Sequence, residues 1–119
     1  MDLSDCRDAC LQTHVACLHA ATHVLQKGED HPRDLVRTLW DCADQSVVAA
    51  NLMSRGSPFH SVTCGACAAL CEAVVKEATE GSYADDPILA KCVADAERCA
   101  KLCWEMAEHE SHADRAAAE

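Results

Sequence analysis

The sequence predicts an all-α protein, an antiparallel up-down-up-down four-helix bundle with a cysteine-lined core. Three observations indicate this fold class. Aromatic residues make up only 3% of the 119 residues, and alanine, valine, leucine and cysteine dominate the apolar half. The prolines and most of the glycines fall between apolar segments, where they separate helices. Nine of the ten cysteines recur at helical spacing.

The first two helices are expected over residues 4–27 and 32–54. Ser4 can accept a hydrogen bond from the first helical turn, and Gly28 can end that helix. Pro32 suits the first turn of the second helix, because proline lacks the N–H group that this turn leaves unpaired.

The third and fourth helices are expected over residues 58–80 and 87–110. Ser57 is a candidate N-cap of the third helix, and Gly81 is the expected stop. Asp86 or the aspartate before it precedes the fourth helix. Short connections between long helices favour antiparallel neighbours, hence the up-down-up-down order.

Length and composition limit the protein class. We expect one domain, residues 1–119, with no transmembrane helix, because no run of 18 apolar residues occurs. The N-terminus has neither the basic nor the apolar stretch of a secretory signal, so we expect a cytoplasmic protein with reduced thiols. The net charge is −10, with lysine and arginine scattered, which argues against a nucleic-acid partner. No membrane partner is expected.

All ten cysteines are predicted to be metal ligands. They are Cys6, Cys10, Cys17, Cys42, Cys64, Cys67, Cys71, Cys92, Cys99 and Cys103. Nine form three triplets, each within an arc of roughly 40–60° on its own helix. One or two buried cysteines can be ordinary packing, but three aligned triplets indicate a thiol-lined interior. Cysteines four or seven residues apart on one helix are poorly placed for disulfides.

On an antiparallel bundle, the sulfurs concentrate towards the end that holds the N-terminus. From that end, the expected levels hold Cys10, Cys64 and Cys103, then Cys67 and Cys99, then Cys17, Cys42 and Cys71. Cys6 is expected to lie lowest and Cys92 highest, with an error of about one turn, or about 5 Å. The other end is expected to be packed with carbon: Val24, Leu35, Val75, Ala78, Ile88 and Leu89.

Five further residues are candidate accessory or access ligands: His14, Met53, His60, Met106 and His109. His14 lies at the edge of the first cysteine stripe, and both a ligand and a core histidine fit that position. Met53 and Met106 lie on core faces near the N-terminal end, with the two other histidines close in height. These four residues could pass ions inward. The alternatives are that the methionines only pack in the core and that the two histidines only face solvent at a helix end.

Thiolate and thioether are soft donors that select Cu(I), Zn(II) or iron–sulfur clusters. One zinc ion or one cluster uses four thiolates, so ten is an excess. Cu(I) suits the excess best because it accepts two or three thiolates. At two per ion, ten cysteines would hold roughly five Cu(I).

The pattern resembles the bacterial cysteine-rich four-helix-bundle copper-storage proteins. The resemblance rests on Cys6-x3-Cys10, Cys64-x2-Cys67-x3-Cys71, Cys99-x3-Cys103 and the Asp41-Cys42-Ala43-Asp44 segment, and covers about residues 3–109. It implies an antiparallel bundle, Cu(I) on core cysteine pairs, and access at one end lined by Met or His. It also implies homo-oligomers, often tetramers, and a cytosolic location for members without a signal peptide. This chain has fewer cysteines than the fullest members, and His14 stands where another cysteine would be expected.

The expected function is therefore non-catalytic storage or buffering of several Cu(I) ions, delivered by a copper-delivery protein. An iron–sulfur ferredoxin-like bundle is one alternative, with Cys64, Cys67, Cys71 and a thiol from a neighbouring helix as ligands. A zinc-binding bundle is another. No single cysteine stands out as a nucleophile, and we expect no enzyme.

Overall fold

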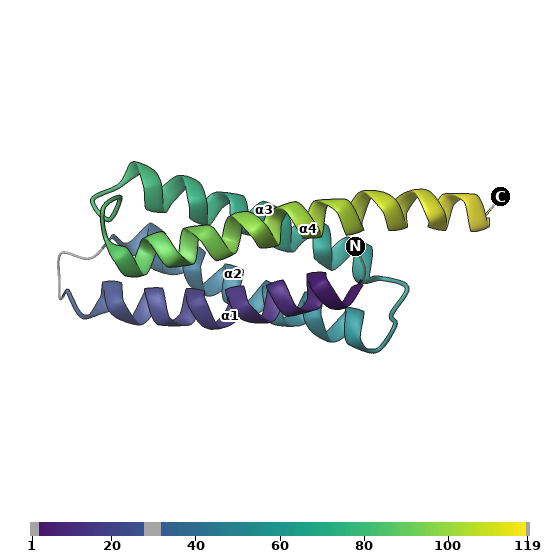
Figure 1. The fold of residues 1–119 in the computed structure, drawn as a ribbon, viewed down its shortest axis with the longest axis horizontal. Coiled ribbons are helices and arrows are strands. Elements are labelled where there is room, and N and C mark those ends of the chain that lie inside the picture. The colour runs from purple at the N-terminus through teal and green to yellow at the C-terminus, as the bar shows by residue number, and fades with distance from the viewer. Residues whose placement is uncertain (1–2, 28–31, 119) are drawn as a thin grey trace.

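The computed structural model describes residues 3–27 and 32–118, with side chains described up to residue 108, and these residues form a four-helix bundle (Figure 1). The helices are α1 (Leu3–Leu25), α2 (Arg33–Ser54), α3 (His60–Glu80) and α4 (Pro87–Ala118). Successive helices run in opposite directions, and each packs against the helices before and after it, with α1 also against α4 (Figure 1). The predicted fold class is confirmed.

The helix ends follow the local chemistry. Gly56 has φ = 66° after α2, and the N–H groups of Gly56 and Ser57 donate to the carbonyls of Met53 and Leu52. This is a Schellman motif, which needs a left-handed residue at that position. Pro58 and its successor form a turn, so α3 begins two residues later than expected.

The last helix is longer than the sequence predicted. It continues to Ala118 rather than stopping near residue 110, and its last turns project past the other three helices (Figure 1). No glycine or proline follows Pro87, and the C-terminal segment is rich in alanine, the best helix former.

Aliphatic side chains fill the core together with the cysteines. Leu39 and Leu89 are the largest fully buried side chains, and Val24 and Val74 lie with them at 0% exposure. Burying one such side chain contributes about 1.5–3 kcal/mol. All six carbon side chains expected at the end away from the N-terminus are in the core: four are buried, and Val75 and Ile88 are partly buried against them. The expected division into a carbon half and a sulfur half stays a prediction, since the buried side chains form one cluster and Leu102 is buried next to Cys103.

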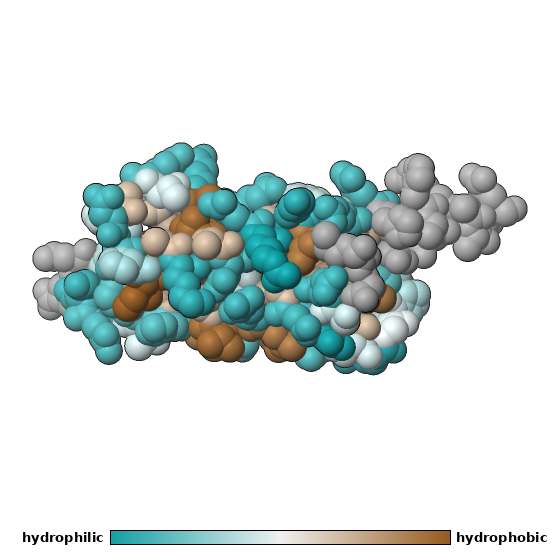
Figure 2. Space-filling model, in the orientation of Figure 1, coloured by the Kyte–Doolittle hydropathy of each residue, from teal (hydrophilic) through white to brown (hydrophobic). Residues whose placement is uncertain are grey.

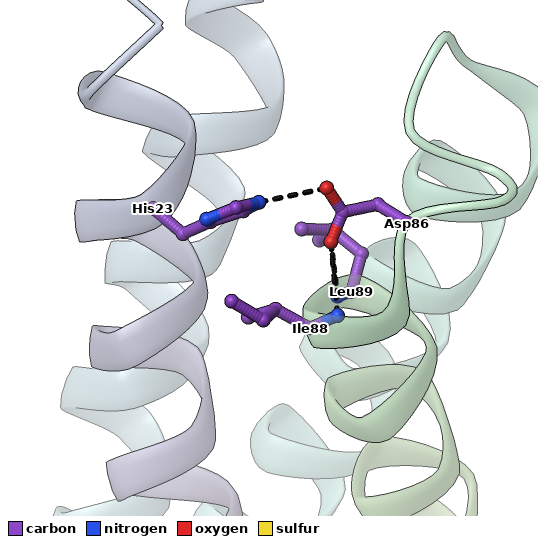
Figure 3. A network of polar contacts seen from close by, with 4 residues as sticks. All are labelled: His23, Asp86, Ile88 and Leu89. Atoms are coloured by element: carbon purple, nitrogen blue, oxygen red, sulfur yellow. Dashed lines mark hydrogen bonds and ion pairs between the residues drawn. The ribbon is translucent and has the colours of Figure 1, made fainter.

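A polar bridge closes the carbon end between α1 and α4 (Figure 3). The Nε2–H group of His23 donates to Oδ2 of Asp86 at 2.7 Å. Oδ1 of the same carboxylate accepts from the backbone N–H groups of Ile88 at 2.9 Å and Leu89 at 3.3 Å, so Asp86 is the N-cap of α4. The hydrogen bond from His23, with those from the backbone, holds the pKa of Asp86 below its ordinary value.

None of the described helices combines the length and the hydropathy that a membrane span requires.

Candidate metal centre

All ten cysteine side chains are buried, with 0–1% of their surface exposed, and all are free thiols. Helices α1, α3 and α4 contribute three each and α2 contributes one. The cysteine stripe of each helix therefore faces the bundle axis, as the helical spacing predicted. Because all four helices supply sulfurs, an ion between the helices could take ligands from several helices at once.

Six of the thiols, which we call the six-thiol group, gather towards the end that holds the α2–α3 connection. They are Cys6, Cys10, Cys64, Cys67, Cys99 and Cys103. The sulfur of Cys103 lies 3.7 Å from Cys6, 3.5 Å from Cys10 and 3.8 Å from Cys99. Cys99 lies a further 3.7 Å from Cys10 and 3.8 Å from Cys67. Two sets of donor atoms meet here within 4.8 Å of one another: Cys10, Cys67, Cys99 and Cys103, and Cys6, Cys64 and Cys103.

The other four thiols, the four-thiol group, lie deeper in the bundle: Cys17, Cys42, Cys71 and Cys92. Cys17 and Cys92 are 3.8 Å apart, and Cys42 and Cys71 are 3.7 Å apart. The thiols of Cys17 and Cys42 lie close enough to shift each other's pKa. The hydroxyl oxygen of Ser46 joins the two groups, because it lies 3.9 Å from the sulfur of Cys42 and 3.5 Å from the sulfur of Cys67. The ten sulfurs therefore form one continuous column.

Cys92 differs from its expected position. Counting along ideal helices put it highest and apart from the other thiols, whereas its sulfur lies against Cys17. The expected height of Cys92 depends on the axial offset between α4 and α1, which helix lengths alone do not give. The contact with Cys17 means that α4 lies nearer to the N-terminal end of α1 than ideal helices of the expected lengths would place it. Cys64 also lies closer to Cys6 than expected, but this difference is within the error of about one helical turn.

Neighbouring thiols change one another's pKa, because an S–H group that donates to a thiolate stabilises the charge. Hydrogen bonds from Cys17 and Cys71 lower the pKa of Cys42 to about 4, and the pKa values of those two donors are raised in turn. Hydrogen bonds from neighbouring thiols, Cys10 first, lower the pKa of Cys67. The thiols of each group are therefore electrostatically coupled, and the loss of a proton by one changes the pKa of its neighbours. A bound cation would stabilise the further thiolates.

Ser46 belongs to the sulfur column, although it lies outside the predicted set of ligands. It is fully buried on α2, and its hydroxyl donates to the carbonyl of Cys42 at 2.7 Å. The same oxygen lies 3.5 Å from the sulfur of Cys67. Ser46 follows Cys42 by four residues, the spacing of Cys6 and Cys10. This four-residue spacing could have identified Ser46 from the sequence, because it places a hydroxyl where the other helices carry a second thiol.

The two predicted methionines are buried near the six-thiol group. The thiol of Cys64 donates to the thioether sulfur of Met53 at 3.8 Å. Met53 and Met106 are 5% and 8% exposed. His60 is buried at the start of α3, and its Nδ1–H donates to the carbonyl of Ser57 at 2.7 Å. The thioether of Met53 therefore lies beside the six-thiol group, and a role of Met53, Met106 or His60 as an access ligand stays a prediction.

The remaining two candidate histidines are not brought to the thiols by any described contact. His14 is half-buried, and its Nδ1–H donates to the carbonyl of Ala43 at 2.6 Å. This hydrogen bond joins α1 to α2, and ligation of a metal by His14 stays a prediction. The side chain of His109 lies outside the described residues.

Comparisons with known proteins agree with this arrangement of thiols. A family model described as copper storage protein, Csp, matches residues 1–108, which include all ten cysteines. An uncharacterized cysteine-rich protein of Bacillus subtilis (strain 168), YhjQ, is 32% identical over 103 residues, which cover 86% of this chain and 93% of the relative. The crystal structure of the Nmul_A1745 protein from Nitrosospira multiformis matches with a TM-score of 0.80 and 33% identity, over 89% of this chain and 94% of that one.

Proposed function

We propose that this chain, which belongs to the copper storage protein family, is a non-catalytic protein that stores several Cu(I) ions on its core thiolates. The observation that carries this proposal is the continuous column of ten buried, reduced thiols, with neighbouring sulfurs 3.5–3.8 Å apart where the contacts are closest. Soft thiolates select Cu(I) over hard cations, and a column of them can hold more ions than one isolated site.

The balance between the negative charge of the thiolates and the positive charge of Cu(I) favours several ions per chain. At two thiolates per Cu(I), the column holds roughly five ions, which leaves an excess of negative charge in a buried place. Sulfurs that bridge two ions allow further Cu(I) to bind, and each added ion cancels one negative charge. Capacity above five ions per chain therefore fits the same column.

The ions are proposed to load at the end that holds the six-thiol group. Met53 lies against Cys64, and Met106 and His60 are buried near the same end. A thioether binds Cu(I) without losing a proton, and it binds more weakly than a thiolate. An ion can therefore stop at methionine and then move to the thiolates, which hold it more tightly.

The surface supports a homo-oligomer. Leu11, Val15 and Leu18 follow one another at spacings of four and three residues along α1, and they are 41%, 65% and 41% exposed. Figure 2 shows hydrophobic side chains gathered along the edge of the molecule over α1. A second copy of the chain that covered this face would bury them. We further propose that the protein acts in the cytoplasm, where its thiols stay reduced, and receives copper from a delivery protein.

Anaerobic Cu(I) titration of the reduced apo protein tests the proposal. We expect ultraviolet thiolate-to-copper bands that grow until several ions are bound per chain, a colourless product by eye, and retention of most of the copper against a competing chelator. Saturation at one ion or none would overturn storage. A brown protein after anaerobic purification would instead support the iron–sulfur alternative.

A further inference from the structure

Four thiols of the six-thiol group form a closed set from three helices, which we call the quartet: Cys10 of α1, Cys67 of α3, and Cys99 and Cys103 of α4. Four of its six sulfur–sulfur separations are 3.5, 3.7, 3.8 and 3.8 Å. The other two pairs also lie within 4.8 Å. All four side chains are fully buried.

These separations are those of a tetrahedral tetrathiolate site. A zinc–sulfur bond of about 2.3 Å in tetrahedral geometry places the sulfurs about 3.8 Å apart. A linear ion with bonds of the same length would hold its two sulfurs about 4.6 Å apart, wider than the four separations above. The quartet can therefore close around one tetrahedral ion with little movement of the backbone.

Two polar groups next to the quartet can stabilise its charge. Four thiols that bind one Zn(II) release four protons and leave a site with a net charge of minus two. The thiol of Cys6 lies 3.7 Å from the sulfur of Cys103, and the hydroxyl oxygen of Ser46 lies 3.5 Å from the sulfur of Cys67. Groups outside the first ligand sphere that donate to the ligands strengthen metal binding.

We propose that the quartet is a discrete site for one Zn(II) ion per chain, which the protein binds when copper is absent. The stoichiometry follows from the geometry. The second set of close donor atoms in the described residues, Cys6, Cys64 and Cys103, shares Cys103 with the quartet and has only two thiols left once the quartet is filled. The four-thiol group does not close within 4.8 Å in the same way. Zinc should therefore stop at one ion, whereas Cu(I), which accepts fewer thiolates, should not.

The test is an anaerobic titration of the reduced apo protein with Zn(II) against a chromophoric chelator, followed by native mass spectrometry. A parallel titration uses Co(II), whose tetrahedral thiolate complexes absorb strongly in the red part of the visible spectrum. We expect saturation at one ion per chain in both, four protons released per Zn(II), and the tetrahedral Co(II) bands.

Two matched variants locate the ion. Cys99→Ser removes a quartet ligand and should lower the affinity for Zn(II) by more than about 100-fold, beyond the loss typical of an outer-shell change. Cys92→Ser makes the same change at a buried thiol of the same helix outside the quartet, and should leave the stoichiometry and the Co(II) spectrum unchanged. Far-ultraviolet circular dichroism reports whether each variant keeps its helices. If Cys99→Ser does not fold, Cys67→Ser removes a quartet ligand from α3.

Weak octahedral Co(II) bands, saturation at no ion or at two or more, or equal loss of zinc binding in the Cys92→Ser variant would overturn the proposal. The copper titration is a separate measurement. A protein that binds one zinc ion but stores no copper would support the quartet and reject storage, and the reverse result would do the opposite.

Discussion

Replacing one carbon and one sulfur side chain tests whether the thiol column exists for metal or for packing. Leu39 is fully buried and is one of the largest side chains in the core. Leu39→Ala should lower the free energy of unfolding of the apo protein by about 2–5 kcal/mol, from lost transfer energy and the cavity left behind. Cys67 is equally buried, but Cys67→Ala removes one sulfur atom, an effect of about 1 kcal/mol if that atom counts like one methylene.

Bound copper should bring the destabilisation caused by Cys67→Ala close to that caused by Leu39→Ala. An ion that binds only the folded state adds about 2.7 kcal/mol when its free concentration is 100 times its dissociation constant. Cys67 belongs to the quartet and lies 3.8 Å from Cys99, so its loss removes a ligand from the most closely spaced set of donors. In the copper-loaded protein, Cys67→Ala should therefore cost up to about 2.7 kcal/mol more than in the apo protein if the variant no longer binds that ion, which makes it comparable to Leu39→Ala.

The assay is urea unfolding followed by far-ultraviolet circular dichroism, with each variant measured anaerobically in the apo and copper-loaded states. Copper is kept at the amount that fills the folded protein, because unfolded thiols also bind metal. If Cys67→Ala costs the apo protein as much as Leu39→Ala does, the thiol contacts are structural and our reasoning is refuted. If loading leaves the difference between the variants unchanged, Cys67 is not a copper ligand.

Three further predictions follow from single contacts. The double variant Met53→Leu/Met106→Leu should slow Cu(I) loading, measured by stopped-flow ultraviolet absorbance, and leave the final number of ions unchanged, because the thiolates remain. Ser46→Cys should raise the copper saturation number measured by native mass spectrometry, because it places an eleventh thiol about where a hydroxyl oxygen now lies 3.5 Å from a core sulfur. Asp86→Asn should reduce the stability of the apo protein most at neutral pH, since the lowered carboxylate pKa stabilises the fold above the ordinary carboxyl pKa, about 3.9, and this contribution is lost as the pH falls. Urea unfolding at several pH values measures it.

Each of these changes has a matched control. Methionine to leucine keeps the core volume, so normal loading kinetics in a folded double variant would remove both thioethers from the route. Ser46→Ala adds no thiol and should not raise the saturation number. Asparagine also caps helices well, so a stability difference that stays constant across the acidic range would assign the effect of Asp86 to the cap and not to its charge.

Much of the fold could be predicted because it depends on local chemistry. The 3.6-residue period shows which side chains share a face of a helix, and Gly56 and Asp86 mark helix boundaries by conformational freedom and by capping. The end of α4 could not be predicted as well. An alanine-rich segment without a stop residue has no sharp boundary in sequence, and the helix continues to Ala118.

The candidate site was predictable in membership and less so in arrangement. Periodicity places every cysteine on a core face, and all ten are buried there. It says nothing about the axial offset between two helices, and this offset puts Cys92 against Cys17. Nor does it identify a serine as part of the column, because Ser46 has a role only through its position beside Cys67.

The sequence by itself thus determined that four helices form and that sulfur lines their shared interior, because both follow from spacing along one helix. Only the tertiary structure decided which sulfurs meet. The quartet, the contact of Met53 with Cys64 and the hydrogen bond of His14 to Ala43 each join different helices. Such contacts depend on the axial offset, rotation and side-chain conformation of packed neighbours, which a pattern along a single helix does not contain.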